Sequence, residues 1–329
     1  MSRPRRIALI GVGHYHSTWY PSYLSIVNRQ QIEIVGIHDP DEALAADRAS
    51  RFGGVPYTDY RRMLDETKPD FVIALGRHVA MPPVFRYLVE SGVPFLMEKP
   101  WAVDLPTLQE LVALAESRKA WAAAPFPMRH TFWAEKAREL IRSGEAGKVS
   151  HILFRMVRPG EKRYIEQGNE WMLDREQAGG GVLINLGCHG FDLARFLTGE
   201  DAEVVSAVTS HAACGLEVDD YAFVTLRTPS GVIFHNEVGY TYPTEDGNDN
   251  ERKVSAENML ITGTNTGVRI VAPGRDEVIE QPQGYVAMWD KVVAECLDAL
   301  ERGDGPPVGV QEAYKGLAPV FDAYRIAGY

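Results

Sequence analysis

The sequence predicts an α/β protein with an N-terminal, doubly wound parallel sheet of the Rossmann type and a C-terminal α/β domain built on a large, open, mainly antiparallel sheet. Two patterns predict this. Up to residue 125, short apolar runs alternate with helical patterns, which is typical of parallel strands joined by right-handed crossovers. Beyond it, the strand candidates are longer and follow one another through turns. The 329 residues leave room for two domains, which we place at 1–125 and 126–329.

In the first domain the apolar runs are short, as expected for strands buried on both faces. They lie at 6–10, 33–38, 71–75, 94–97 and 121–124. The helical patterns between them have recognisable ends. The pattern at 41–52 stops at two glycines, the one at 81–91 stops at Gly92, and the one at 105–118 follows Asp104, a good N-cap.

The second domain begins with a helical pattern at 130–143 and ends with two more, at 286–301 and 311–326, the last of which can pack back on the first domain. Its strand candidates lie at 149–157, 204–210, 221–228, 232–239, 258–262 and 268–272. The charged segment 244–251 is the best candidate for a mobile loop. A large sheet face rarely stays bare, so we expect a second copy of the chain to cover one face, giving a homo-oligomer, a dimer or tetramer.

Composition excludes several kinds of partner. The net charge of −11 argues against nucleic acid or an anionic membrane, although a local field can still favour an anionic small molecule. The three cysteines are scattered, which suits a reducing compartment and provides no thiolate metal site. No apolar run approaches the roughly 18 residues that span a bilayer. The first run is interrupted at Gly11 and is typical of a core strand, not of a signal peptide. We therefore expect a cytoplasmic protein.

A glycine turn follows the first strand candidate. Gly11-Val12-Gly13 matches the first two glycines of Gly-x-Gly-x-x-Gly, the turn that places a pyrophosphate at a helix N-terminus, whereas His16 takes the third position. An ordinary turn is the alternative. Asp39 ends the second strand, where a carboxylate can accept hydrogen bonds from ribose hydroxyls and repel a 2′-phosphate. NAD is therefore favoured over NADP. Asp39 can also cap the following helix, and the two roles are compatible.

Two further motifs carry polar side chains in apolar surroundings. Glu98-Lys99-Pro100 follows the apolar run 95–97, at the carboxyl edge of the predicted sheet. Gly179-Gly180-Gly181 precedes a segment in which Asn185, His189 and Asp192 share one face if it is helical. The alternative for this stripe is a buried, hydrogen-bonded histidine with a structural aspartate. His14 and His16 have no third ligand at a matching spacing, so we expect no metal.

These pieces together resemble the Gfo/Idh/MocA family, named for glucose–fructose oxidoreductase, inositol dehydrogenase and a rhizopine-catabolism protein. They occur in family order along nearly the whole chain: the glycine turn, Asp39, Glu98-Lys99-Pro100, Phe126-Pro127-Met128-Arg129, Trp171…Asp174 and Gly179-Gly180-Gly181…His189…Asp192. The resemblance implies a Rossmann domain, a second domain with a large open sheet, and nicotinamide-dependent oxidation or reduction of sugars, cyclitols and related compounds.

By this resemblance, Lys99 matches the lysine beside the nicotinamide and His189 the catalytic histidine. Asn185 stands where many relatives have aspartate and others asparagine. The residues implied as catalytic are Lys99, His189 and Asn185. Those implied to face substrate are Lys99, Arg129, Trp171, Asn185 and His189. Those implied to bind the cofactor are Gly11, Gly13, His14, Tyr15, Asp39, Leu75, Gly76, His78, Glu98 and Lys99. The segment Leu75-Gly76-Arg77-His78 replaces the common Thr-Pro-Asn-His pattern.

The expected activity is transfer of a hydride between NAD and a secondary alcohol or ketone of a sugar, cyclitol or sugar acid. Such a reaction needs a base for the hydroxyl proton. We take His189 as that base and Lys99 as the group that polarises the oxygen, although the roles can be exchanged. Arg129 leaves room for a carboxylate or phosphate on the substrate, with a structural salt bridge as the alternative. Other possibilities are a catalytically silent NAD-binding sensor or scaffold and a cofactor-retaining sugar oxidoreductase.

Overall fold

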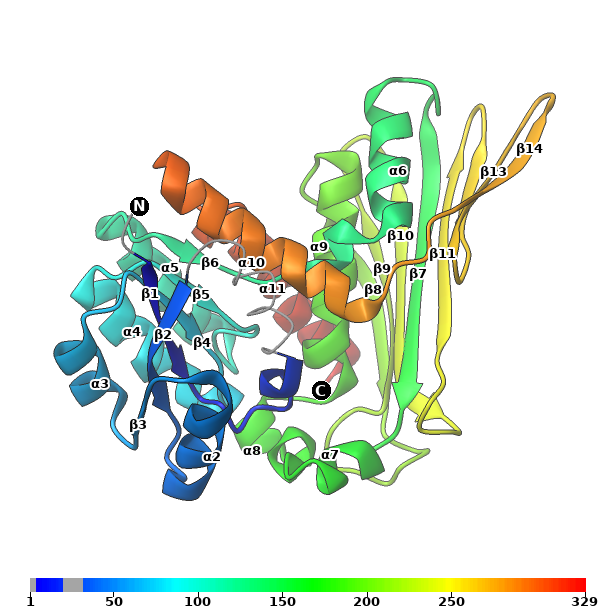
Figure 1. The fold of residues 1–329 in the computed structure, drawn as a ribbon. Helices are drawn as coiled ribbons and strands as arrows, with labels where there is room; N and C mark the ends of the chain where they lie inside the picture. The colour runs from blue at the N-terminus through cyan, green and yellow to red at the C-terminus, as the bar shows by residue number, and fades with distance from the viewer. Residues whose placement is uncertain (1–3, 20–31) are drawn as a thin grey trace.

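The computed structural model of the protein describes residues 4–19 and 32–329, and within these ranges its strands form two sheets (Figure 1). One is parallel and built from the N-terminal residues. The other is mainly antiparallel and built from residues beyond 148. The fold class expected from the sequence is therefore confirmed.

The first sheet has the order β3-β2-β1-β4-β5-β6 and is parallel throughout. Its strands are β1 (Arg5–Ile10), β2 (Ile32–His38), β3 (Val55–Tyr57), β4 (Phe71–Ala74), β5 (Phe95–Met97) and β6 (Ala122–Ala123). Its helices are α2 (Glu42–Phe52), α3 (Tyr60–Thr67), α4 (Met81–Ser91) and α5 (Leu105–Ser117), with short 3-10 turns η1 (Tyr15–Trp19) and η2 (His78–Ala80). The strand order reverses between β1 and β4, so a crevice forms at their carboxyl ends, where such sheets bind ligands.

The second sheet has the order β14-β13-β12-β11-β7-β10-β9-β8, and β7 and β10 are its parallel neighbours. Its strands are β7 (Val149–Pro159), β8 (Glu203–Ser210), β9 (Tyr221–Arg227), β10 (Ile233–Tyr242), β11 (Asp249–Ala256), β12 (Leu260–Gly263), β13 (Gly267–Ala272) and β14 (Arg275–Glu280). The connecting helical segments are η3 (Pro127–His130), α6 (Phe132–Arg142), α7 (Lys162–Glu166), η4 (Glu170–Leu173), α8 (Arg175–Ala178), the π-helical turn η5 (Leu183–Gly187) and α9 (Cys188–Thr198).

The two faces of this sheet differ. Along β9, Ala222, Val224 and Leu226 are buried, whereas Phe223 and Thr225 on the other face are partly exposed, as the two-residue period of a strand requires. Helices α6 and α9 cover the buried face, which we call the inner face (Figure 1). In the part of the chain that the structure describes, no helix packs on the outer face (Figure 1).

The last two helices return to the N-terminal half. Helix α10 (Tyr285–Arg302) covers one face of the parallel sheet, where Val292, Val293 and Leu297 share a core with Ile7 and Phe71. Helix α11 (Val310–Ala327) lies against both α5 and α9. The sheets are therefore joined by a shared core as well as by the chain.

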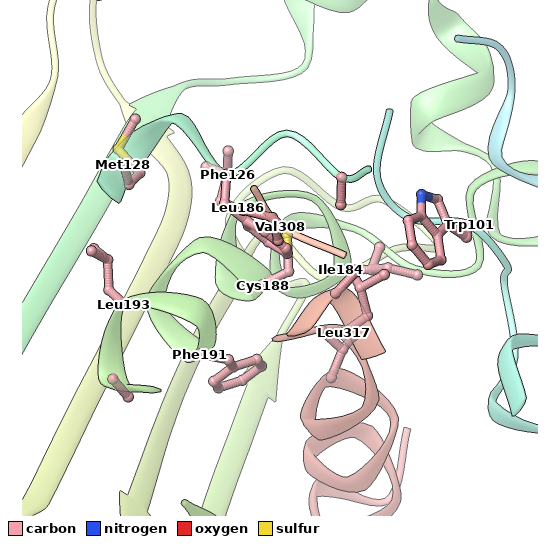
Figure 2. Packing of buried hydrophobic residues seen from close by; sticks show 14 of the residues in the cluster. Trp101, Phe126, Met128, Ile184, Leu186, Cys188, Phe191, Leu193, Val308 and Leu317 are labelled. Carbon is pink, nitrogen blue, oxygen red and sulfur yellow. The ribbon is translucent and has the colours of Figure 1, made fainter. Parts of the chain in front are cut away.

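Helix α9 is embedded in that shared core. Phe191 and Leu193 of α9 lie among residues of other elements, including Phe126 before η3 and Leu317 of α11 (Figure 2). Ile184, Leu186 and Cys188 continue this apolar surface through η5. Polar side chains on η5 and α9 are thus held in fixed positions by their apolar neighbours.

The prediction of a mobile loop at 244–251 is wrong for its last three residues. Residues from Asp249 onward form β11, which pairs with β7 on one side and β12 on the other. The sequence hides this strand because only Val254 on it is fully buried, and Ala256 is its only other apolar residue. Strand β3 was also not predicted, since it has three residues and contains Pro56. Among the described residues, no helix is long and apolar enough to cross a membrane.

Candidate active site

A cavity of about 900 Å³ opens at the carboxyl edge of the parallel sheet. Its walls include residues that directly follow β1, β2 and β4, namely Gly11, Gly13, Asp39, Leu75 and Gly76. The reversal of strand order between β1 and β4 brings these three strand ends together. The cavity is therefore placed where a dinucleotide binds in a doubly wound sheet.

The glycine turn fits its position tightly. Gly11 has φ +74°, and a Cβ there would overlap the carbonyl oxygen of Leu75, so a side chain is excluded on two grounds. The Gly13 amide donates a 2.7 Å hydrogen bond to Oδ2 of Asp39. The turn and the end of β2 are thus locked together at the cavity wall.

Asp39 is buried, and it lines the cavity. Its Oδ1 accepts a 3.1 Å hydrogen bond from the Asp41 amide. Helix α2 is capped by Asp41 instead, which accepts from the amides of Ala43 and Leu44. Asp39 is therefore placed by the turn that precedes the helix, and the cap role suggested by the sequence belongs to Asp41.

The structure shows how His16 is accommodated at the third position of the Gly-x-Gly-x-x-Gly motif. The segment Tyr15–Trp19 is a 3-10 turn, and the His16 side chain is buried with its Nδ1 3.0 Å from Oε1 of Glu98. Its ring also lies edge-on against Trp289 of α10, with ring centroids 4.8 Å apart. The imidazole thus connects the glycine turn to the end of β5 and to α10.

Burial makes the His16–Glu98 pair neutral. It raises the pKa of Glu98 to about 8, even though Lys99 opposes the shift. Burial, with the charge of Lys99 next, lowers the pKa of His16 well below its usual value. Both shifts favour the uncharged forms at neutral pH, so the contact between Glu98 and His16 is a hydrogen bond within a neutral pair.

Lys99 lies directly after Glu98, and its side chain reaches the other half of the chain. Its Nζ donates to the main-chain oxygen of Asn185 at 2.6 Å and to the Asn185 Oδ1 at 2.9 Å. Asn185 lies in the π-helical turn η5, a distortion that is frequent at functional sites. Both residues are buried, so this contact is shielded from bulk water.

The amide of Asn185 is fixed by two hydroxyls that the sequence analysis did not identify. Its Nδ2 donates to the hydroxyls of Tyr164 and Tyr240, each at 2.8 Å. Arg163 in turn donates to the Tyr164 hydroxyl at 2.7 Å. Two-residue alternation along β10 could have placed Tyr240 on the inner face, whereas Tyr164 belongs to a five-residue helix without a sequence signal.

His189 begins α9 one turn beyond Asn185. Its ring is buried and lies edge-on to Phe126, and its Nδ1 has no hydrogen-bond partner among the described residues. Burial above all, then the charges of Lys99, His16 and Arg158, lowers the pKa of His189 well below its usual value. The imidazole is therefore uncharged at neutral pH and retains a nitrogen able to bind a proton or a ligand.

Arg129 is committed to an ion pair. Its Nε lies 2.8 Å from Oδ2 of Asp192, and its Nη2 lies 3.2 Å from Glu312. Burial disfavours the charge of Arg129, but Asp192 more than compensates and raises its pKa. The polar residues that the sequence analysis placed on one helix face therefore have different partners. Asn185 contacts Lys99, whereas Asp192 forms an ion pair with Arg129.

Trp171 comes from the second half of the chain and forms part of the cavity wall. Its Nε1 donates to Asn169 at 3.1 Å, and its ring packs against His78 and His14. His78 is buried behind it, where burial lowers its pKa to about 3 despite a 2.8 Å contact with the Ala178 carbonyl. His14 lines the cavity together with Trp171, whereas His78 does not.

The remaining predicted residues lie around this wall. Tyr15 is partly buried and packs against His14, His16 and Tyr164 without lining the cavity. The space beside the glycine triplet is filled by the protein itself. A Cβ at Gly180 would overlap the Tyr324 hydroxyl, and one at Gly181 would overlap the Asp219 carbonyl. The triplet therefore permits close packing at the start of η5.

Comparison with known proteins gives two matching family models. One, described as the oxidoreductase family with an NAD-binding Rossmann fold, matches residues 5–124. The other, described as the GFO/IDH/MocA C-terminal domain, matches residues 134–269.

Individual relatives are distant but cover much of the chain. D-glucoside 3-dehydrogenase of Escherichia coli (strain K12) is 25% identical over 96% of this chain and 92% of its own. Myo-inositol dehydrogenase Hyg17 of Streptomyces leeuwenhoekii is 29% identical over 68% of this chain and 65% of its own. A solved structure of levoglucosan dehydrogenase with NADH and levoglucosan has a TM-score of 0.88 at 17% identity, covering 99% of this chain and 98% of that one.

Proposed function

The chain belongs to the Gfo/Idh/MocA family of NAD-binding oxidoreductases, and from this we propose that it transfers a hydride between NAD and a secondary alcohol or ketone of a sugar, cyclitol or sugar acid. The names of similar proteins support this substrate class, since they are dehydrogenases of a glucoside, of myo-inositol and of levoglucosan. The reacting carbon would lie between the two halves of the chain.

The cavity at the carboxyl edge of the parallel sheet fits the cofactor. Gly11 and Gly13 form a turn without side chains, as a pyrophosphate requires. Asp39 presents a carboxylate on the same wall, suited to ribose hydroxyls and unfavourable to a 2′-phosphate. His14, Leu75 and the rest of the wall residues would complete the site, with Trp171 closing it from the other half.

Lys99, Asn185 and His189 would carry the proton chemistry. NAD, when bound, supplies the hydride acceptor or donor. An ammonium has three N–H donors, and Asn185 takes two of those on Lys99, leaving one for the oxygen of the substrate. His189, neutral and with a free Nδ1 among the described residues, would take the hydroxyl proton. Tyr164 and Tyr240 would act through Asn185 by fixing its amide.

The observation that carries this proposal is the buried double contact between Lys99 and Asn185, with the Lys99 charge among the causes that lower the pKa of His14 on the cavity wall. The test is NADH formation, followed by absorbance, on mixing the protein and NAD with a panel of sugars, cyclitols and sugar acids. A saturable rate with at least one member would support the proposal. NADH binding without turnover of any member, in either direction, would favour a silent sensor.

We further propose that residues 1–125 form the NAD-binding domain and that residues 126–329 form the domain for substrate binding and oligomerisation. The outer face of the second sheet supports a homo-oligomer, because Val208 is exposed and Phe223 partly exposed on it without a covering helix in the described chain. Three unpaired cysteines support a reducing compartment, for which the cytoplasm is the simplest choice.

A further inference from the structure

A second cavity, of about 510 Å³, lies on the inner face of the large sheet. Its floor comes from the ends of three adjacent strands, with Arg158 on β7, Tyr242 on β10 and Arg252 on β11. The turn between β12 and β13 and the start of α10 form its sides. The sequence analysis identified none of these residues.

The charge of this cavity opposes that of the chain. The whole protein has 45 acidic and 34 basic residues, yet the described residues that line the cavity include two arginines and no aspartate or glutamate. The other polar groups are amides and hydroxyls, such as those of Asn250 and Thr264. A negatively charged ligand would therefore be favoured here although the protein as a whole repels anions.

Arg252 is the clearest sign of a missing ligand. It pairs in register with Phe154 of β7 and points to the same side as the buried Val254, because residues two apart on a strand share a face. Its Nε is buried without a hydrogen-bond partner among the described residues. Burial, followed by the charge of Arg158, lowers the pKa of Arg252 to about 10, so no carboxylate of the described chain balances it.

This cavity adjoins the candidate active site on two sides. Tyr240, which binds the Asn185 amide, lies two residues before Tyr242 on β10, and Tyr242 lines the cavity. Met288 lines the cavity, and its neighbour Trp289 packs against His16.

The charges of the two sites are also linked. Arg158 is near enough to His189 to contribute to its lowered pKa. The cavity arginines and the proposed base are therefore within electrostatic reach of each other.

We propose that this cavity binds an oxyanion group of the substrate, a carboxylate or a phosphate, with Arg252 and Arg158 as its charged partners. Planar guanidinium groups bind both oxyanions through paired hydrogen bonds. The inference rests on the proposed function, because it names a feature of the substrate at that same site. It also reassigns the anion-binding role that the sequence suggested for Arg129, whose guanidinium is occupied by Asp192.

The test compares matched sugars. Titration calorimetry on the protein saturated with NADH would measure binding of several hexoses, their uronates and their 6-phosphates, and NAD reduction would be measured with the same set. At least one uronate or one 6-phosphate should bind about 10- to 100-fold more tightly than its neutral parent. The uronate and phosphate arms show which oxyanion the site takes.

Variants separate this inference from the proposed function. Arg252→Gln should weaken binding of the anion about 10-fold or more, well beyond its effect on the neutral parent, whereas Arg252→Lys should retain part of the preference. Arg62→Gln, an exposed arginine on α3, is the matched control, and retained NADH binding shows that each variant is folded.

Three outcomes decide the matter. Anions that bind no better than neutral sugars, or an unchanged preference in Arg252→Gln, would overturn the inference. Arg252-dependent binding without turnover of any sugar would uphold it and remove the proposed function.

Discussion

The Nζ of Lys99 lies 2.6 Å from the main-chain oxygen and 2.9 Å from the side-chain oxygen of Asn185, across 86 residues of sequence. Lys99 lies two residues beyond β5 of the parallel sheet, and Asn185 lies in a π-helical turn on the inner face of the second sheet. Neither half of the chain contains this contact alone. The candidate active site is therefore a product of how the two sheets pack, and the predictions below test its parts.

Loss of Lys99 or His189 should stop turnover without unfolding the protein. Lys99→Ala and His189→Ala are each expected to lower kcat by about two to four orders of magnitude, since both act on one proton-transfer path. The double variant should be little worse than either single variant, because the two groups serve the same transition state. Steady-state NADH absorbance measures this, with NADH binding and His151→Ala as controls. Wild-type turnover in either single variant would contradict the assignment.

Asp39 should select the cofactor. Wild-type protein is expected to bind NADH more tightly than NADPH, because the carboxylate repels the 2′-phosphate, and Asp39→Ala should reduce that ratio by about tenfold or more. Fluorescence titration with both nucleotides gives the ratio. Asp39→Asn keeps the hydrogen bond from the Gly13 amide and removes only the charge, so it separates repulsion from turn stability. Tighter NADPH binding by the wild type would rule the idea out.

Glu98 should make stability depend on pH. Its pKa is raised from 4.5 to about 8 by burial, so the folded chain holds a proton that the unfolded chain releases. This bound proton stabilises the folded chain fully below about pH 4.5. Its contribution to the free energy of unfolding falls as the pH rises and is lost above about pH 8. Relative to Glu98→Gln, the wild type should lose up to about 1.4 kcal/mol of unfolding free energy per pH unit in this window.

Urea unfolding of the two proteins at several pH values measures that difference. The exposed Glu66→Gln on α3 is the control, since its partner Arg62 is also exposed. A constant difference between wild type and Glu98→Gln from pH 5 to pH 8 would show that Glu98 is already charged in the folded protein.

Tyr324 should stabilise the π-helical turn η5 and the residues just before it. Its hydroxyl donates to Asp219 at 2.7 Å and accepts from the amides of Gly181 and Ile184. Tyr324→Phe removes the partner of the buried Ile184 amide and one of the donors to Asp219, which keeps the Gly181 and Leu183 amides. The change is expected to cost about 1–3 kcal/mol of unfolding free energy. Denaturant titration measures it, with Tyr314→Phe, at a partly buried tyrosine of α11 whose hydroxyl accepts from Gln109, as the control. An effect no larger than that of the control would contradict this role.

Phe223 should contribute to self-association. Phe223→Glu places a charge on the outer face of the large sheet, where a second copy would bury it at a cost. Light scattering coupled to size-exclusion chromatography should show an oligomer for the wild type and a smaller species for the variant. Val55→Glu, at an exposed apolar residue on β3 of the parallel sheet, tests whether any added acid has the same effect. A monomeric wild type would dismiss the proposal.

The sequence predicts the buried strands well because burial on both faces leaves unbroken apolar runs, as in β1 and β4. It misses β11, where tertiary pairing with β7 overrides a polar sequence. Motifs point to Lys99, Asn185 and His189, but not to Tyr164 or Arg252, because their roles depend on contacts between distant segments. Arg129 shows the same limit: only the packing of α9 and α11 shows that its partners are Asp192 and Glu312.

The first turn of α10 has a wider consequence. Met288 touches the arginine-lined cavity and Trp289 touches His16, behind the glycine turn, so a displacement of this single turn alters both places at once. Thermodynamic linkage then makes the effect reciprocal: whatever factor a bound nucleotide adds to the affinity for an anionic sugar, that sugar must add to the affinity for the nucleotide. A helix from the last fifth of the chain would in this way couple the affinities of the two ligands.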